Sequence, residues 1–344
     1  IVKLFDSNRN LLALHVCEKM KAKKWILDAK FIGKPSPSNF KLLEEDIDDN
    51  LKDGEVICQA VYLSVDPYMR FLDKEVGKVL YGEQVAKVIL SRNPDFKVGG
   101  LVQADIGWRS VTKVTDPSKM KLIQQLGDLS PSLALGTLGM PGMTAYFGVL
   151  NVLKVKAGET CVVTSAGGAV GNVAGQIAKL KGCKVIGFAG SKEKCDMIKE
   201  VGFDYAFNYK EVTLQEAMTK AAPEGVDCYF DNVGGEFTNN MLSFMNTNGR
   251  IAICGSMSTY NLDENHPTGP LPYHTILKKA LMVQGFRVYS FSAEWPAGFK
   301  EMIQWVKEGK IKYQETITDG FDNMVDAFIG LFKGTNIGKA IVKC

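Results

Sequence analysis

Small residues occur at a spacing that can hold a phosphate group, in the pattern Ala166-x-Gly168-x-x-Gly171. The short apolar stretch before them, residues 160–164, predicts a strand, and apolar residues recur at helical spacing from Val170 onward. A strand, a tight glycine turn and a helix together offer a pyrophosphate the unpaired N–H groups and the positive dipole end of the helix. The pattern therefore predicts a dinucleotide site. An alanine replaces one glycine of the usual fingerprint, and an ordinary turn between strand and helix remains the alternative.

The end of the next predicted strand, residues 184–188, indicates which dinucleotide fits. An NAD site usually has an acid there, about 20 residues after the glycines, to bind the ribose 2′-hydroxyl. Here the strand is followed by small neutral residues and then by Lys192 and Lys194. Lysines attract a 2′-phosphate, whereas an acid would repel it. We therefore predict NADPH, while Glu193 between the lysines keeps NAD as an alternative and the lysines themselves could be a solvated helix start.

Further segments carry residues that can reach a bound ligand. Residues 231–235 and 254–260 each follow a predicted strand, at the carboxyl ends where doubly wound sheets bind ligands. Residues 66–70 and 139–146 lie outside the predicted sheet. Each segment alone is explained as well by turns or packing, so the prediction depends on their occurrence together.

The elements that must position these residues change in character near residue 140. Before it, short apolar or alternating runs are separated by glycine and proline, which predicts a β-rich region. After it, strands and helices alternate, as in a parallel sheet covered on both faces. Thr213 and Glu216 form a capping box that opens one of these helices. The predicted strands of the second part are residues 160–164, 184–188, 205–208, 226–230, 250–254 and 281–286.

Length and composition set the broad class. A chain of 344 residues suggests roughly two domains, and a net charge of +3 without a basic block gives little support to a nucleic-acid or membrane partner. Eight cysteines without a C-x-x-C pair indicate reduced thiols and a cytoplasmic location. With only three histidines, no metal site is expected. Residues 1–19 are predicted to be an extension outside the fold.

Several long sequence segments resemble those of one protein family. They resemble the zinc-independent prostaglandin reductases and plant double-bond reductases of the medium-chain dehydrogenase/reductase superfamily, over about residues 20–344. The resemblance implies an α/β fold in which a doubly wound parallel (Rossmann) sheet, residues 139–305, is inserted in a β-rich GroES-like catalytic domain, residues 20–138 and 306–344. It also implies a homodimer. The strings are residues 65–70, 134–147, 168–171, 176–185, 227–237, 249–255 and 258–261.

The resemblance also implies a site and a reaction. NADPH would lie in the cleft between the domains and reduce the carbon–carbon double bond of an α,β-unsaturated ketone or aldehyde. For this reaction we take the nicotinamide ribose hydroxyl and the phenol of Tyr260 as candidate catalytic donors to the enolate oxygen, and Tyr68 as a candidate for the substrate wall. Packing with a hydrogen bond is the alternative for both tyrosines. Lys194 and Tyr209 would hold the adenosine phosphate end. The remaining cofactor-binding residues would be Gly168, Ala169, Val170, Gly171, Asn232, Cys254, Gly255, Ser256, Met257, Ser258, Thr259, Tyr260, Phe286, Arg287, Val288 and Asn336.

Alternative hypotheses for the function remain open at this point. Similar zinc-free enzymes reduce quinones, alcohol oxidation is a weaker rival, and a non-catalytic nucleotide-binding scaffold is the reading from another class. The chain also departs from the family: residues 262–273 are longer and more polar than the usual proline-rich loop, and Lys278 stands where mammalian members carry a tyrosine. Both departures border the substrate side, so a preference for eicosanoids is open.

Overall fold

The computed structural model describes residues 20–344 apart from 73–74, 263–268 and 270–271. The predicted extension, residues 1–19, lies outside the described residues, as does most of the departing loop at 262–273. No helix among the described residues has the length and apolar character needed to cross a membrane.

Six parallel strands form one sheet, in the order β10-β9-β8-β11-β12-β13. The chain moves outward from β8 to β10 and then returns to β11, so β8 and β11 lie side by side at the point where the direction of winding reverses. This doubly wound order confirms the predicted α/β class. The strands are β8 (Thr160–Val163), β9 (Lys184–Ala189), β10 (Tyr205–Asn208), β11 (Val226–Asp231), β12 (Met245–Ile253) and β13 (Met282–Gly285).

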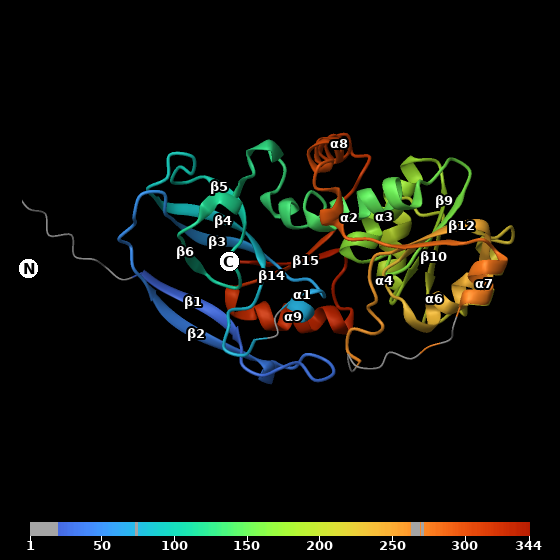
Figure 1. Ribbon diagram of the computed structural model, residues 1–344, viewed down its shortest axis with the longest axis horizontal. Coiled ribbons are helices and arrows are strands. Elements are labelled where there is room, and N and C mark those ends of the chain that lie inside the picture. Colours follow the sequence, from blue (N-terminus) through green and yellow to red (C-terminus); the bar gives the residue numbers. More distant parts are fainter. Residues whose placement is uncertain (1–19, 73–74, 263–268, 270–271) are drawn as a thin grey trace, which may run out of the picture.

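Helices connect these strands and cover the sheet, as Figure 1 shows on its right side. In α3 the apolar residues Val173, Ala174 and Ile177 recur at helical spacing and are all buried. The predicted capping box opens α5, where the Glu216 backbone N–H donates to the Thr213 hydroxyl (3.2 Å) and the Thr213 N–H donates to the Glu216 carboxylate (3.0 Å). The helices of this part are α3 (Ala169–Leu180), α4 (Lys192–Glu200), α5 (Leu214–Ala221), α6 (Gly235–Met241) and α7 (Tyr273–Lys278).

A second, mostly antiparallel sheet has the order β14-β15-β3-β4-β5-β7, with β6 also paired to β3. The late strand β15 pairs with the early strand β3, so the chain returns to its first part after the parallel sheet (Figure 1). The predicted boundaries at residues 138/139 and 305/306 stay predictions. The strands are β3 (Val56–Ser64), β4 (Glu83–Ser91), β5 (Leu101–Asp105), β6 (Val111–Val114), β7 (Lys121–Leu122), β14 (Glu315–Asp319) and β15 (Lys339–Lys343), and a separate pair is β1 (Met20–Leu27) with β2 (Phe40–Ile47).

The described residues form four further α-helices, which pack on the elements above. Helix α2 contacts both α3 and α8, and α9 packs on β15. Helix α9 ends at Gly334, which adopts the left-handed conformation (φ +71°) that a C-terminal glycine allows. These helices are α1 (Met69–Leu72), α2 (Met140–Phe147), α8 (Trp295–Lys307) and α9 (Met324–Lys333).

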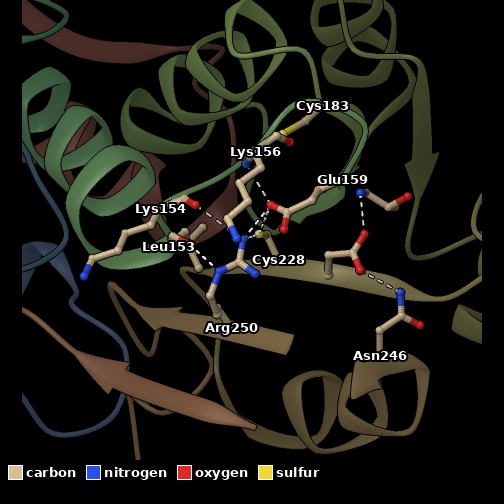
Figure 2. Close-up of polar contacts among 10 residues, drawn as sticks. Leu153, Lys154, Lys156, Glu159, Cys183, Cys228, Asn246 and Arg250 are labelled. Carbon is tan, nitrogen blue, oxygen red and sulfur yellow. Dashed lines mark hydrogen bonds and ion pairs between the residues drawn. The ribbon is translucent and has the colours of Figure 1, made fainter. Parts of the chain in front are cut away.

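Arg250 of β12 lies in a cluster of polar contacts at the amino-terminal end of the parallel strands (Figure 2). Its Nε donates to the Leu153 carbonyl (2.5 Å), and its Nη2 contacts Glu159 Oε2 (2.5 Å) and the Cys228 sulfur (3.0 Å). Glu159 directly precedes β8, so the cluster lies at the opposite end of that strand from the glycine turn. We regard this cluster as structural.

Candidate active site

The turn between β8 and α3 has the shape of a phosphate cradle. Gly168 is the N-cap of α3 and offers no capping side chain, which leaves the first amides of the helix for a ligand. A Cβ placed on Gly171 would lie 2.4 Å from the Ser165 carbonyl oxygen, so only glycine permits this close approach of helix and turn. Ser165 itself adopts a left-handed conformation (φ +50°), a strain typical of functional turns. The turn therefore fits a pyrophosphate.

Lys194 lies against the same turn. A Cβ on Gly167 would come within about 3 Å of the Lys194 stem, and its Nζ donates to the Gly334 carbonyl at 2.8 Å. Burial, followed by the nearby Lys210, lowers the pKa of Lys194. A second anionic phosphate would relieve both effects, because it would offer the ammonium group a partner of opposite charge.

The neighbours of Lys194 in the chain are engaged in local contacts. Lys192 is paired with Asp196 (2.5 Å), and Glu193 bonds its own backbone N–H and the Ser191 hydroxyl, which lowers the pKa of Glu193. Strand β9 ends at a neutral residue, Ala189. Tyr209, at the end of β10, is half-exposed, and its hydroxyl would lie 3.0 Å from a Cβ placed on Gly190. These contacts gather Lys194 and Tyr209 at the carboxyl ends of β9 and β10.

Asn232 joins the carboxyl ends of the two strands at the winding reversal. Its Nδ2 donates to the Thr164 carbonyl (2.7 Å), its backbone N–H donates to the Thr164 hydroxyl (2.9 Å), and its carbonyl accepts from Met257 N–H (3.2 Å). Asn232 is buried, so it fixes the geometry beside the glycine turn.

Asp231 is a positioning residue that the sequence analysis did not single out as a site residue. It is fully buried and accepts hydrogen bonds from the Tyr229 hydroxyl (2.9 Å), from two backbone N–H groups and from the Thr238 hydroxyl (2.7 Å). The signal was present in the sequence, since an acid directly before Asn-Val-Gly-Gly can cap the turn that follows.

The loop after β12 holds Tyr260 next to this point. Its phenol accepts a hydrogen bond from the Ser256 backbone N–H (3.3 Å), so its own proton can be donated elsewhere. Burial raises the pKa of Tyr260, which keeps that proton in place at neutral pH. The loop is internally braced, with Ser256 and Thr259 hydroxyls 2.7 Å apart and the Ser258 hydroxyl donating to Val233 O (2.7 Å).

The short helix α1 contacts Tyr260 from the other sheet. The Arg70 Nε donates to the Tyr260 carbonyl (2.5 Å), and the Phe71 ring meets the Tyr260 ring edge-on at 4.6 Å. The same segment carries Tyr68, whose ring meets Tyr81 at 6.3 Å. Burial, and then Asp66 and Glu83, raise the pKa of Tyr68 far above its usual value. The structure thus brings Tyr68 to the β-rich side of the site.

The other predicted residues lie after β12 and β13 or in the loop before β15. Phe286 packs edge-on against Phe230 of β11 (6.2 Å), Val288 is buried and Arg287 is exposed. Asn336 donates to the Gly338 carbonyl (2.8 Å), and the Gly338 N–H donates to Gly167 O (2.8 Å), which ties this loop to the glycine turn. Burial raises the pKa of the Cys254 thiol to about 12, so it is inert at neutral pH.

Two features of the sequence lie outside this arrangement. Tyr146 of α2 donates to Glu301 of α8 (2.5 Å) and therefore serves packing. Within the described residues, no three His, Cys, Asp or Glu side chains gather where they could hold a metal ion, and His15 and His266 fall outside those residues.

Comparisons with known proteins identify relatives along nearly the whole chain. Residues 169–308 match a family described as zinc-binding dehydrogenase, and residues 23–123 match the N-terminal domain of oxidoreductase. Prostaglandin reductase 1 of Bos taurus is 51% identical over 94% of this chain and 99% of its own length. The NADP-dependent 2-alkenal reductase of Nicotiana tabacum is 38% identical over 95% of the chain and 98% of its length.

A solved structure shows the same architecture. CurA from Vibrio vulnificus in complex with NADPH superimposes with a TM-score of 0.86 at 37% identity, covering 93% of this chain and 98% of that chain.

Proposed function

The chain belongs to the medium-chain dehydrogenase/reductase superfamily, in the group that contains the prostaglandin reductases, and on that premise we propose that it is an NADPH-dependent reductase of the carbon–carbon double bond of α,β-unsaturated ketones and aldehydes. One observation carries the proposal. The glycine turn, Lys194 and the Tyr260 loop lie along one edge of a doubly wound sheet, where such sheets bind dinucleotides.

The cofactor residues of this chain divide by the part they would hold. Gly168, Ala169, Val170 and Gly171 would meet the pyrophosphate, and Lys194 with Tyr209 would bind the 2′-phosphate end. The rest of the cofactor would lie along residues that follow β11, β12 and β13 and along the loop before β15. These are Asn232, Cys254, Gly255, Ser256, Met257, Ser258, Thr259, Tyr260, Phe286, Arg287, Val288 and Asn336.

NADPH, when bound, supplies the hydride for the β-carbon of the substrate. The chemistry left to the protein is stabilisation of the enolate oxygen that develops, which requires hydrogen-bond donors fixed in advance. Tyr260 meets this need, because its phenol is anchored through Ser256 and retains its proton. Tyr260 or solvent then protonates the α-carbon, and Tyr68 forms part of the substrate wall.

Two features of the chain support a homodimer and a cytoplasmic location. Strand β13 is the edge of the parallel sheet, and Met282 and Val283 on it are 42% and 43% exposed. An apolar, unpaired edge favours pairing with a second copy, which supports a homodimer. The cysteines among the described residues are free thiols, mostly buried, which supports a cytoplasmic location.

A substrate panel tests the function. Oxidation of NADPH, with NADH alongside, would be followed against an alkenal, an alkenone, an oxoprostaglandin and a quinone. We expect turnover of the enal and enone with NADPH and a marked loss with NADH. Turnover of quinones alone would favour the hypothesis of a quinone reductase. Tight NADPH binding without turnover of any substrate would favour the hypothesis of a non-catalytic nucleotide-binding scaffold.

A further inference from the structure

An open, solvent-facing cavity of about 610 Å³ adjoins the tyrosine side of the site. Its walls include apolar Leu72, Val79 and Ile106, together with Tyr81, Asp105 and Arg109. Tyr81 contacts the ring of Tyr68 at 6.3 Å, and Leu72 directly follows Phe71, which packs on Tyr260. The cavity is therefore next to the place where the reacting carbons of an enone must lie, and it can receive the distal part of the substrate.

One carboxylate lines this cavity, and a second lies beside it on the neighbouring strand. Asp105 lines the cavity, and Glu83 lies directly opposite Asp105 in the antiparallel register of β4 and β5, so both side chains project from the same face of the sheet. Asp105 accepts hydrogen bonds from Tyr81 and from the Gly82 backbone N–H. Tyr289 lies in the segment after β13. Burial is the main cause that raises the pKa of Tyr289, and the negative charges of Glu83 and Asp105 raise it further. Both acids, which belong to the antiparallel sheet, are therefore close enough to the segment after β13 to act on it electrostatically.

The surrounding cations compensate these acids only in part. Lys121 approaches Glu83 and Lys119 approaches Asp105, and Gln103 donates to Glu83 at 3.4 Å. Burial, followed by Asp66 and Asp105, nevertheless raises the pKa of Glu83 to about 7, and burial raises the pKa of Asp105. The Asp66 carboxylate is itself bound by the buried Lys339 ammonium (2.8 Å). The region already disfavours negative charge.

Arg109 does not reverse this balance. Its guanidinium is paired with Glu45, which lies on β2 and also binds Lys24 of β1 (2.5 Å). A guanidinium already bound to a carboxylate offers less to an incoming anion, because the ligand would have to replace or share that partner.

We propose that Asp105 and Glu83 are specificity-determining residues, which select uncharged enones and enals and disfavour substrates whose distal part carries a carboxylate. Like charges brought together in a partly buried site cost binding free energy, and the cost falls on the transition state as well as on the bound substrate. The inference rests on the proposed function and names the substrate class for it.

The test compares a long-chain oxo-enoic acid with its methyl ester, so that only the charge of the distal end differs. In the wild-type enzyme we expect kcat/KM for the ester to exceed that for the acid by about tenfold, the size of one unit charge interaction across several ångströms in a partly buried site. The ratio should increase as the pH rises through about 7, because Glu83 ionises there.

The double variant Asp105→Asn with Glu83→Gln keeps the shape and removes both charges. We expect it to reduce the ester-to-acid ratio of kcat/KM to about twofold or less and to keep measurable turnover of an uncharged alkenone of the same length, since neither residue stabilises the reacting atoms. The control is Asp95→Asn, which removes one exposed carboxylate elsewhere and should leave the ratio unchanged.

Equal rates for acid and ester in the wild type would overturn the inference, as would an undiminished ratio in the double variant. If the wild type reduces neither the ester nor the alkenone, the proposed function fails. The same two compounds are then compared as ligands of the NADP⁺-loaded protein by tryptophan fluorescence. Tighter binding of the ester than of the acid, lost in the double variant, supports the electrostatic inference, and equal binding overturns it.

Discussion

At the scale of single residues, the site contains polar groups that still have a hydrogen-bond donor available for a ligand. The Tyr260 phenol accepts from Ser256 N–H and keeps its proton, and within the described part of the chain the Lys194 ammonium bonds one carbonyl, that of Gly334. Each can therefore add a strong bond to a ligand without first losing a structural one. Asp231 differs, because its carboxylate is used within the fold, by the hydroxyls of Tyr229 and Thr238 and by two backbone N–H groups of the turn that follows β11.

Replacing Tyr260→Phe removes one hydroxyl and leaves the ring against Phe71. We expect the single-turnover rate of NADPH oxidation to fall about a hundredfold, the usual effect of losing one oxyanion donor. Binding of NADPH, measured by fluorescence titration, should change little. An unchanged single-turnover rate would remove Tyr260 from the catalytic role.

Replacing Lys194→Ala should separate the two coenzymes. A hydrogen bond to a charged group contributes about 1.5–3 kcal/mol, so we expect KM for NADPH to rise about tenfold to a hundredfold. KM for NADH, which has no 2′-phosphate, should stay within about twofold of the wild type because no charge-assisted bond is lost. The matched control is Lys192→Ala, whose ammonium is already paired with Asp196. Equal effects on both coenzymes would contradict the assignment.

Sequence reasoning can propose residues that belong to local motifs, and it cannot see those that only strand pairing brings together. Gly168, Gly171 and Tyr260 stand in strings that can be read along the chain. Glu83 and Asp105 stand in no motif and become neighbours only through the register of β4 and β5.

At the scale of elements, the glycine turn depends on how closely α3 approaches the end of β8. The local pattern predicted most of the parallel-sheet elements, and β10 agrees with its predicted bounds at both ends. Strand β2 was missed because Lys41, Glu44, Glu45 and Asp46 hide its alternation, and it is held by its full-length pairing with β1. Helix α6 was missed because it begins directly at Gly235, in a sequence that reads as a turn.

Replacing Gly171→Ala tests that close approach. The added Cβ would lie 2.4 Å from the Ser165 carbonyl oxygen, so the helix must move away from the turn. We expect a loss of about 1–3 kcal/mol in the free energy of unfolding, as for other overpacked sites, and a weaker affinity for NADPH. Urea denaturation and fluorescence titration measure the two effects. Gly285→Ala is the control, because a Cβ there meets nothing within 4 Å, and similar losses in both variants would contradict the explanation.

At the scale of the whole molecule, Lys339 connects segments far apart in the sequence. It is almost completely buried, and its ammonium bonds the Val65 carbonyl (2.9 Å) and the Asp66 carboxylate (2.8 Å), which the Ser64 hydroxyl also contacts. The preceding residue, Gly338, bonds the glycine turn through Gly167. No local pattern predicts this link, because it requires β15 to have returned beside β3.

Replacing Lys339→Met leaves the buried Asp66 without its ammonium partner. We expect a loss of about 3–5 kcal/mol in the free energy of unfolding, and a partial recovery when Asp66→Asn is added, since the uncompensated charge is then gone. Urea denaturation gives both values. The exposed pair Lys21–Asp46 (2.7 Å) is the matched control, and Lys21→Met should have little effect. A loss no larger than the control's would show that the buried pair is not needed.

The bridge between Gly168 and Gly338 also bears on the order of folding. These two residues are separated by most of the second half of the chain, and closing so long a loop is slow compared with forming a local turn. The parallel strands can therefore assemble before the coenzyme cradle has its final shape. During refolding, nucleotide affinity would then be acquired in the last step, when β15 pairs with β3.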